Sequence, residues 1–80
     1  MKVEVCLFAT LGTYLPPGTS GDSVTLEFPD QTTVGQVIGS LHIPDDLDSL
    51  RVVNGHDAGL EQILKDGDVL SVFPPLAGGQ

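Results

Sequence analysis

The chain has 80 residues, of which 11 are acidic and only 3 are Lys or Arg, so its formal net charge is −8. This length fits one small domain and leaves no room for a large substrate cavity, so we expect a carrier or binding module, not an enzyme. Nucleic acids and anionic membranes both need cationic surfaces, so neither is an expected partner. The acidity suits a basic protein partner, or it simply keeps the protein in solution.

Cys6 is the single cysteine, so the chain cannot form an internal disulfide. It lies among apolar residues, where a free cysteine is usually a small buried hydrophobe. The N-terminal apolar stretch is too short and too charged for a signal peptide, and no segment is long enough to span a bilayer. We therefore expect a cytoplasmic location.

The first third of the chain predicts two strands joined by a loop. Residues 2–9 alternate, which places Val3, Val5 and Leu7 on one face and Glu4, Cys6 and Phe8 on the other. Residues 10–22 are rich in Gly and Pro and predict a loop, long for a hairpin, with a short helical turn around residues 11–14. Residues 23–28 alternate again and predict the second strand.

A helix follows the second strand. Thr33 and Gln36 have the spacing of a capping box. The helix places one apolar stripe toward the core: Val34, Val37, Ile38 and Leu41. Gly35 and Gly39 each cost about 1 kcal/mol of helix stability relative to Ala. They either let the helix lie close to the sheet or are only tolerated.

The second half predicts two more strands, at residues 50–54 and 69–73. Asn54-Gly55 and Asp66-Gly67 predict tight turns, and residues 60–64 predict one helical turn. The order of elements is therefore ββαββ. It predicts an α+β domain with a four-stranded mixed sheet and one main helix packed on one face.

The motifs of common active sites are missing from the sequence. There is no GxxxxGK[ST] and no GxGxxG segment. His42, expected at the helix end, and His56, expected in a turn, are not at metal-ligand spacing. The acidic residues 45–48 are read as a solvated loop, because an EF-hand needs its full ligand series. We expect no bound metal and no bound cofactor.

The C-terminal segment is the most informative part of the sequence. The last predicted strand leads directly into Pro74-Pro75-Leu76-Ala77-Gly78-Gly79-Gln80. Prolines favour an extended backbone, and glycines without side chains fit a narrow channel. We therefore divide the chain into a folded domain, residues 1–73, and a flexible tail, residues 74–80, which can present a carboxyl group to another protein's active site.

A strand followed by Pro-Pro, an aliphatic residue and Ala-Gly-Gly resembles the C-terminus of the ThiS/MoaD sulfur-carrier family, and most of all its molybdopterin synthase small-subunit branch. The segment Leu64-Lys65-Asp66-Gly67-Asp68-Val69 resembles that family's turn before its last strand. The resemblance implies a β-grasp, or ubiquitin-like, fold. It also implies that Gly79 carries sulfur as a thiocarboxylate, that Gly78 gives clearance, and that the segment Pro74, Pro75, Leu76 and Ala77 sets reach and docking.

The resemblance implies two enzymes as partners. An E1-like, ATP-using and zinc-containing enzyme would adenylate the terminal glycine, and the large subunit of molybdopterin synthase would accept the sulfur. The sequence departs from the family at one point, because Gln80 follows the second glycine. Either a peptidase removes Gln80, or the chain is inactive as a carrier, or Gln80 is tolerated.

Docking needs a surface as well as a tail. We expect Phe8 and Phe73 to form an exposed apolar patch that meets a partner; the alternative places one or both rings in the core. Three other functions remain open. They are a sulfur donor for thiamin, cysteine or a secondary metabolite, a ubiquitin-like modifier that joins Gly79 to a target lysine, and a binding domain with an inert tail.

Overall fold

The computed structural model describes residues 1–19, 21–43 and 50–74. In chain order their elements are β1 (Lys2–Leu7), the 3-10 helix η1 (Ala9–Tyr14), β2 (Ser23–Glu27), α1 (Val34–Ser40), β3 (Leu50–Val53), β4 (His56–Asp57) and β5 (Val69–Phe73). The order predicted from the sequence is confirmed, with one strand added. The predicted short helical turn after the first strand is confirmed as η1, and it begins at Ala9, so β1 ends two residues earlier than predicted.

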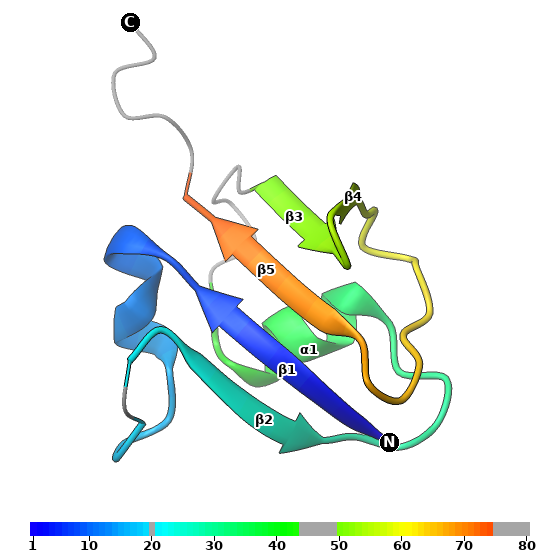
Figure 1. Cartoon of the computed structure of the whole chain (residues 1–80), viewed down its shortest axis with the longest axis horizontal. Coiled ribbons are helices and arrows are strands. Elements are labelled where there is room, and N and C mark those ends of the chain that lie inside the picture. Colours follow the sequence, from blue (N-terminus) through cyan, green and yellow to red (C-terminus); the bar gives the residue numbers. More distant parts are fainter. Residues whose placement is uncertain (20, 44–49, 75–80) are drawn as a thin grey trace, which may run out of the picture.

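The described strands form one mixed sheet in the order β2-β1-β5-β3-β4. The first and last strands, β1 and β5, are parallel neighbours near its middle, while β2 and β3 flank them in antiparallel pairs. Figure 1 shows α1 lying across one face of the sheet, while no described element covers the other face. This is the predicted two-layer α+β arrangement, a β-grasp fold.

The sheet has five strands among the described residues, where the sequence predicted four. The additional strand β4 pairs with the end of β3 through a tight hairpin. The predicted Asn54-Gly55 turn is confirmed, because both residues have positive φ, as this type of turn requires. His56 was wrongly expected in a turn and belongs to β4. Two polar residues, His56 and Asp57, carry no alternation from which so short a strand could be recognised.

The helix begins as predicted. The Thr33 hydroxyl accepts the Gln36 backbone N–H at 3.2 Å, and the Gln36 side-chain oxygen accepts the Thr33 N–H at 2.9 Å, so the capping box is complete. The predicted stripe of Val34, Val37, Ile38 and Leu41 is buried. The stripe therefore faces the sheet.

The helical turn predicted at residues 60–64 is wrong. The backbone of this segment bonds to the start of α1 instead: the carbonyls of Gln62 and Leu60 accept the N–H groups of Val34 at 2.9 Å and Gly35 at 2.8 Å. Groups used in this way are not available for a helix of their own. The segment therefore runs alongside the helix start as an irregular loop.

The two helix glycines have different surroundings, and neither brings the helix close to the sheet. A Cβ on Gly35 would meet the Leu60 carbonyl oxygen at 3.1 Å, so Gly35 permits close approach of the 60–64 loop. A Cβ on Gly39 would meet nothing within 4 Å. Gly39 therefore has no packing role and is only tolerated, as the second of the two alternatives from the sequence predicted.

Polar side chains hold the turn before β5. The Asp68 carboxylate accepts the Lys65 N–H at 2.8 Å and the Asn54 side-chain amide at 2.9 Å, while the Asn54 amide oxygen accepts the Val69 N–H at 2.9 Å. The Asp66 carboxylate accepts the first N–H of β1 at 2.7 Å. The turn that resembles the sulfur-carrier motif thus fixes where β1 and β5 begin.

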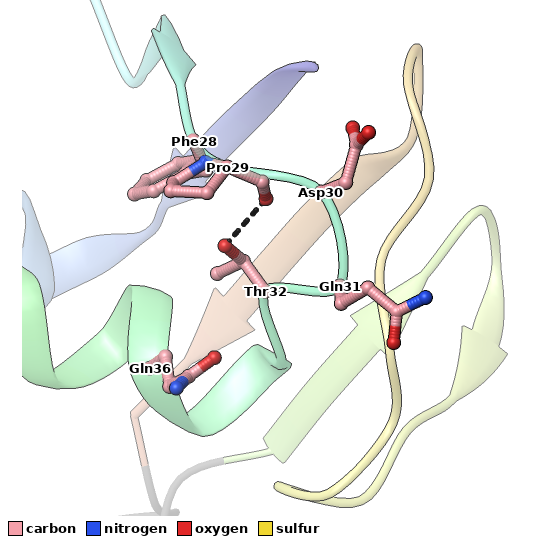
Figure 2. A pocket seen from close by; sticks show the side chains of 6 residues that line it. All are labelled: Phe28, Pro29, Asp30, Gln31, Thr32 and Gln36. Atoms are coloured by element: carbon pink, nitrogen blue, oxygen red, sulfur yellow. Dashed lines mark hydrogen bonds between the residues drawn. The ribbon is translucent and has the colours of Figure 1, made fainter.

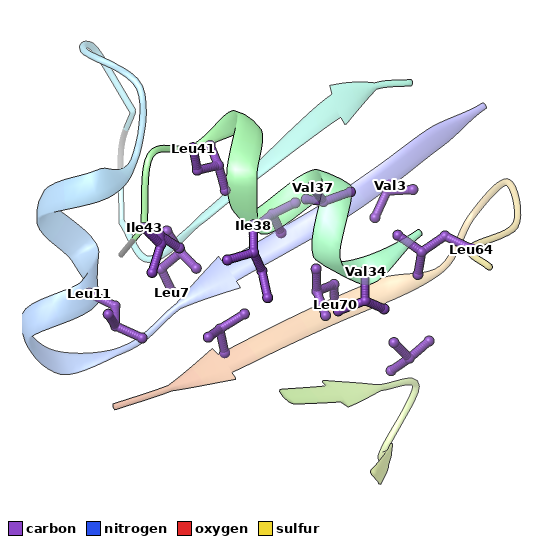
Figure 3. Packing of buried hydrophobic residues seen from close by; sticks show 13 residues of the cluster. Val3, Leu7, Leu11, Val34, Val37, Ile38, Leu41, Ile43, Leu64 and Leu70 are labelled. Carbon is purple, nitrogen blue, oxygen red and sulfur yellow. The ribbon is translucent and has the colours of Figure 1, made fainter. Parts of the chain in front are cut away.

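The core lies between α1 and the covered face of the sheet (Figure 3). Its buried apolar residues are Val3, Val5, Leu7, Leu11, Val34, Val37, Ile38, Leu41, Ile43, Val53, Leu64, Leu70 and Val72. Within the described residues no helix is both long and apolar enough to cross a membrane.

Candidate functional site

Phe8 and Phe73 lie together on the uncovered face of the sheet. Their rings stack, with centroids 4.6 Å apart and planes 8° from parallel. Phe8 is half-buried and Phe73 is 36% exposed. Because β1 and β5 are parallel, both rings lie at the same end of the sheet, where the chain passes from β5 into Pro74. The two rings therefore lie on a shared surface, as the sequence predicted. Their role in binding a partner stays a prediction.

Backbone geometry holds Phe8 in place. Its N–H donates to the Val72 carbonyl at 3.2 Å, and its carbonyl accepts the Leu11 N–H at 3.0 Å where η1 begins. The next residue, Ala9, has a φ of 53°, which turns the chain sharply out of β1. The backbone of Phe8 is therefore held by β5 on one side and by η1 on the other.

Leu50 is a third apolar residue at this end, and it was not singled out from the sequence. It is the register partner of Phe73 across the β3–β5 pair, so the two side chains point to the same face. It is 53% exposed. The sequence of β3 indicates that Leu50 and Val52 share one face of the strand. Which face of the sheet they share depends on the register of β3 against β5, and no local pattern specifies this register.

Cys6 is less buried than the sequence predicted. It is half-buried on the uncovered face, not enclosed in the core, because it occupies the opposite face of β1 from Val5 and Leu7. Its thiol donates to the Glu4 carboxylate at 3.7 Å. Burial, followed by the nearby Glu4 carboxylate, raises the pKa of the Cys6 thiol, so it stays protonated and a weak nucleophile at neutral pH.

The tail residues fall mainly beyond the described part. Pro74 is half-buried and directly follows β5. The predicted site residues Pro75, Leu76, Ala77, Gly78 and Gly79 lie outside the described residues, as does the acidic segment 45–48. Their roles stay as the sequence predicted them.

An open hollow lies at the other end of the sheet, at the connection from β2 to α1 (Figure 2). Its volume is about 360 Å³, and it is lined by Phe28, Pro29, Asp30, Gln31, Thr32 and Gln36. Two of its polar side chains have structural partners: the Thr32 hydroxyl donates to the Pro29 carbonyl at 2.7 Å, and Gln36 belongs to the capping box. The hollow does not contact the aromatic stack.

The histidines stand apart from any cluster of ligands. His42 follows α1 with a φ of 64°, and His56 is exposed in β4. Among the described residues no group of three or more His, Cys, Asp or Glu side chains can hold a metal ion. The surface around Phe8 and Phe73 is therefore the best candidate site in the described part of the chain.

Comparison with protein families identifies the chain. The family model described as Mut7-C ubiquitin matches residues 1–78. No curated protein matches the sequence.

Solved structures share this fold. Small archaeal modifier protein 1 from Haloferax volcanii is 27% identical with a TM-score of 0.75, covering 94% of this chain and 98% of its own. A putative subunit 1 of molybdopterin converting factor from Pyrococcus furiosus is 29% identical with a TM-score of 0.73, covering 94% of this chain and 98% of its own.

A third structure contains two proteins. It is the complex of subunits 1 and 2 of molybdopterin-converting factor from Helicobacter pylori, in which the matching chain is 25% identical with a TM-score of 0.61, covering 99% of this chain and 100% of its own. These neighbours are small carrier and modifier proteins, in agreement with the expectation that this chain is not an enzyme. The chain belongs to the Mut7-C ubiquitin family and is a ubiquitin-like protein of the MoaD/ThiS kind.

Proposed function

We propose that this protein is a sulfur carrier whose Gly79 carboxyl group becomes a thiocarboxylate and donates sulfur in the synthesis of the molybdenum or tungsten cofactor. The observation that carries the proposal is the Pro-Pro-Leu-Ala-Gly-Gly segment, which follows directly on the parallel strand β5 of a β-grasp domain. The similarity to subunit 1 of molybdopterin converting factor supports it.

The chemistry requires activation by another protein. A carboxylate is anionic and lacks a good leaving group, so it does not react with sulfur nucleophiles directly. An E1-like enzyme would join a Gly79 carboxylate oxygen to the α-phosphorus of ATP and release pyrophosphate. A sulfur nucleophile would then attack the carbonyl carbon, forming the C–S bond as AMP leaves with the electrons of the broken C–O bond. ATP binds to that enzyme, and this chain supplies the acyl group.

The active form must end at Gly79. Whatever follows that residue, Gln80 included, would first be removed by a peptidase, because only a terminal residue carries a free α-carboxyl group. Gly78 has no side chain and would let the terminus enter a narrow active site. The segment Pro74, Pro75, Leu76 and Ala77 would set the reach of the tail.

The acceptor is proposed to be a large subunit equivalent to subunit 2 of molybdopterin converting factor, which binds subunit 1 in the Helicobacter pylori complex. Phe8 and Phe73 would contact it beside the tail, since a central apolar patch is a usual anchor of such interfaces. A donor for thiamin, cysteine or a secondary metabolite would use the same acyl chemistry with another acceptor. All of these enzymes, and this carrier, are proposed to be cytoplasmic.

The test uses a chain that ends at Gly79. We expect incubation with the E1-like enzyme of the same organism, ATP and a sulfide donor to replace one oxygen by sulfur, as read by intact-mass spectrometry. A chain that ends at Ala77 serves as control and should keep its mass. No ATP-dependent change in the Gly79 form would contradict the proposal.

A modifier function is the second candidate, because small archaeal modifier protein 1 is a structural neighbour. In that case the activated Gly79 carbonyl forms an amide with a lysine of a target protein. High-mass conjugates that disappear from cell extracts on deletion of Gly79 would favour it over sulfur transfer. If removing residues 78–80 changed neither conjugates nor cofactor synthesis, the tail would be inert and the chain a binding domain.

A further inference from the structure

The single asparagine of the chain lies directly before a glycine, in the turn between β3 and β4. Both residues have positive φ, 52° for Asn54 and 87° for Gly55. A two-residue hairpin turn of this kind strongly favours Asn, Asp and Gly, because other side chains are strained at positive φ. The geometry of the turn therefore favours a residue pair that is also chemically labile.

An Asn-Gly pair can lose ammonia in water without an enzyme. The backbone nitrogen of Gly55 gives its proton to the solvent and attacks the side-chain carbonyl carbon of Asn54, and the new C–N bond closes a succinimide ring. The bond from that carbon to the side-chain nitrogen breaks, and the nitrogen leaves with the electron pair and a proton from the solvent as ammonia. Water then opens the ring at either carbonyl, which leaves aspartate or isoaspartate.

The position of the pair makes it accessible to this reaction. Asn54 and Gly55 are both exposed, so water reaches them in the folded domain. Gly55 has no Cβ that would obstruct the approach of its nitrogen to the neighbouring side chain. Whether the reaction is fast therefore depends on how freely the Asn54 side chain moves.

The folded domain holds both polar atoms of the Asn54 carboxamide. Its oxygen accepts the Val69 N–H at 2.9 Å, and its nitrogen donates to the Asp68 carboxylate at 2.9 Å. The Asn54 backbone N–H also donates to the Val69 carbonyl at 2.9 Å. Asp68 is itself fixed, because its second carboxylate oxygen accepts the Lys65 N–H at 2.8 Å. We call the bonds from Asp68 and Val69 to the Asn54 side chain the clamp.

The clamp opposes ring closure. The attack makes the planar carboxamide carbon tetrahedral and expels its nitrogen, so the hydrogen bond from that nitrogen to Asp68 must break. The carboxamide must also turn toward Gly55, away from the orientation in which the Val69 N–H holds its oxygen. The reaction therefore proceeds from a locally opened state, and a stronger clamp makes that state rarer.

We propose that Asn54 is a deamidation site of this protein, and that Asp68 and Val69 suppress its deamidation while the hairpin is bound to the start of β5. This inference is independent of the proposed sulfur-carrier function. It also predicts the effect of the modification. Aspartate at this position places a second carboxylate against Asp68 in place of a hydrogen-bond donor, and isoaspartate lengthens the backbone within the turn, so both products should break the clamp.

The first test compares folded and unfolded wild-type protein. Both are incubated at the same neutral pH and temperature, the second in denaturing urea, and peptide mapping by mass spectrometry measures aspartate and isoaspartate at position 54. The unfolded chain should deamidate at least about tenfold faster, because it has no clamp. Equal rates would overturn the protective role of the fold, and no reaction in urea would overturn Asn54 as the site.

The second test removes the clamp from the folded protein. Asp68→Ala should deamidate about fivefold faster than the wild type, because the open state becomes more populated. Asp66→Ala is the matched control: it removes a carboxylate of the same turn, whose bond at 2.7 Å is to the Lys2 N–H. Its rate should stay near that of the wild type. Equal rates of the two variants, or a slower rate for Asp68→Ala, would overturn the clamp.

A third measurement examines the modified state. Asn54→Asp should unfold at a lower temperature than the wild type, because it brings two carboxylates together. Adding Asp68→Asn to this variant should recover part of the loss, since only one carboxylate then remains at the clamp. An unchanged unfolding midpoint for Asn54→Asp, or no recovery in the double variant, would overturn the predicted effect of the modification.

Discussion

The two faces of the sheet differ in what lies against them, although the same strands form both. In β5, Leu70 and Val72 are fully buried beneath α1, while Phe73 is 36% exposed on the uncovered face. In β1, Val5 and Leu7 are buried and Cys6 is not, and Phe8, the residue after β1, is only half-buried. One strand thus stabilises the domain through one face and leaves the other available to a partner, so substitutions on the two faces should have separable effects.

The largest expected contrast lies within β5. Leu70→Ala should lower the free energy of unfolding by about 2–5 kcal/mol, because it leaves a cavity in a fully packed core. Phe73→Ser removes a ring that is partly in water and loses mainly its stacking on Phe8, worth about 0.5–1.5 kcal/mol. Urea denaturation measures both, and Phe73→Ser should weaken partner binding with the fold intact. Global unfolding of Phe73→Ser would instead place that ring in the core.

A smaller effect is expected where the turn fixes both strands. Asp68→Ala should lower the free energy of unfolding by about 1–2 kcal/mol, because the Lys65 N–H and the Asn54 amide lose a charged acceptor, although water replaces part of it. Asp30→Ala is the control, since Asp30 is exposed in a turn. Thermal unfolding compares them. Equal stability of the two variants would show that the Asp68 network contributes nothing.

The two glycines of α1 give a paired test of the packing between the helix and the 60–64 loop. Gly39→Ala should stabilise the protein by about 0.5–1 kcal/mol, because alanine favours a helix and the site is open. Gly35→Ala should be less favourable than Gly39→Ala by about 1 kcal/mol, because its methyl group crowds the Leu60 carbonyl. Chemical denaturation of both variants measures the difference. An equal gain at both positions would mean that the 60–64 loop moves aside without cost.

The smallest effect concerns the thiol on the uncovered face. Glu4→Gln removes a negative charge that raises the pKa of Cys6, so the thiolate fraction at pH 8 should increase. Iodoacetamide should then alkylate Cys6 a few-fold faster. Glu27→Gln serves as control, because Glu27 pairs with Lys2 at the far end of β1. Identical rates for Glu4→Gln and the wild type would refute this account of the thiol.

The regular elements could be predicted because each follows a local rule. Alternation in β1, the capping box of Thr33 and Gln36, and the Asn54-Gly55 turn all depend on residues close in sequence. The error at residues 60–64 has another cause, which is contact between distant segments. Residues 60–64 look helical by spacing, but their backbone groups bond to α1.

The candidate site was only partly predictable for the same reason. Phe8 and Phe73 could be placed on a shared face by period and by position next to the tail. Leu50 could not, because its place beside Phe73 depends on the register of β3 against β5, which no local pattern specifies. Cys6 was placed on the correct face, but its burial was overestimated, because no described element covers that face of β1.

The central claim is that the chain works through the acyl group of Gly79. Intact-mass spectrometry of the protein isolated from its own cells, grown while they make the cofactor, tests it most directly. We predict a population that ends at Gly79 and has one oxygen replaced by sulfur. A population that consists entirely of unmodified chains still ending in Gln80 would contradict the account.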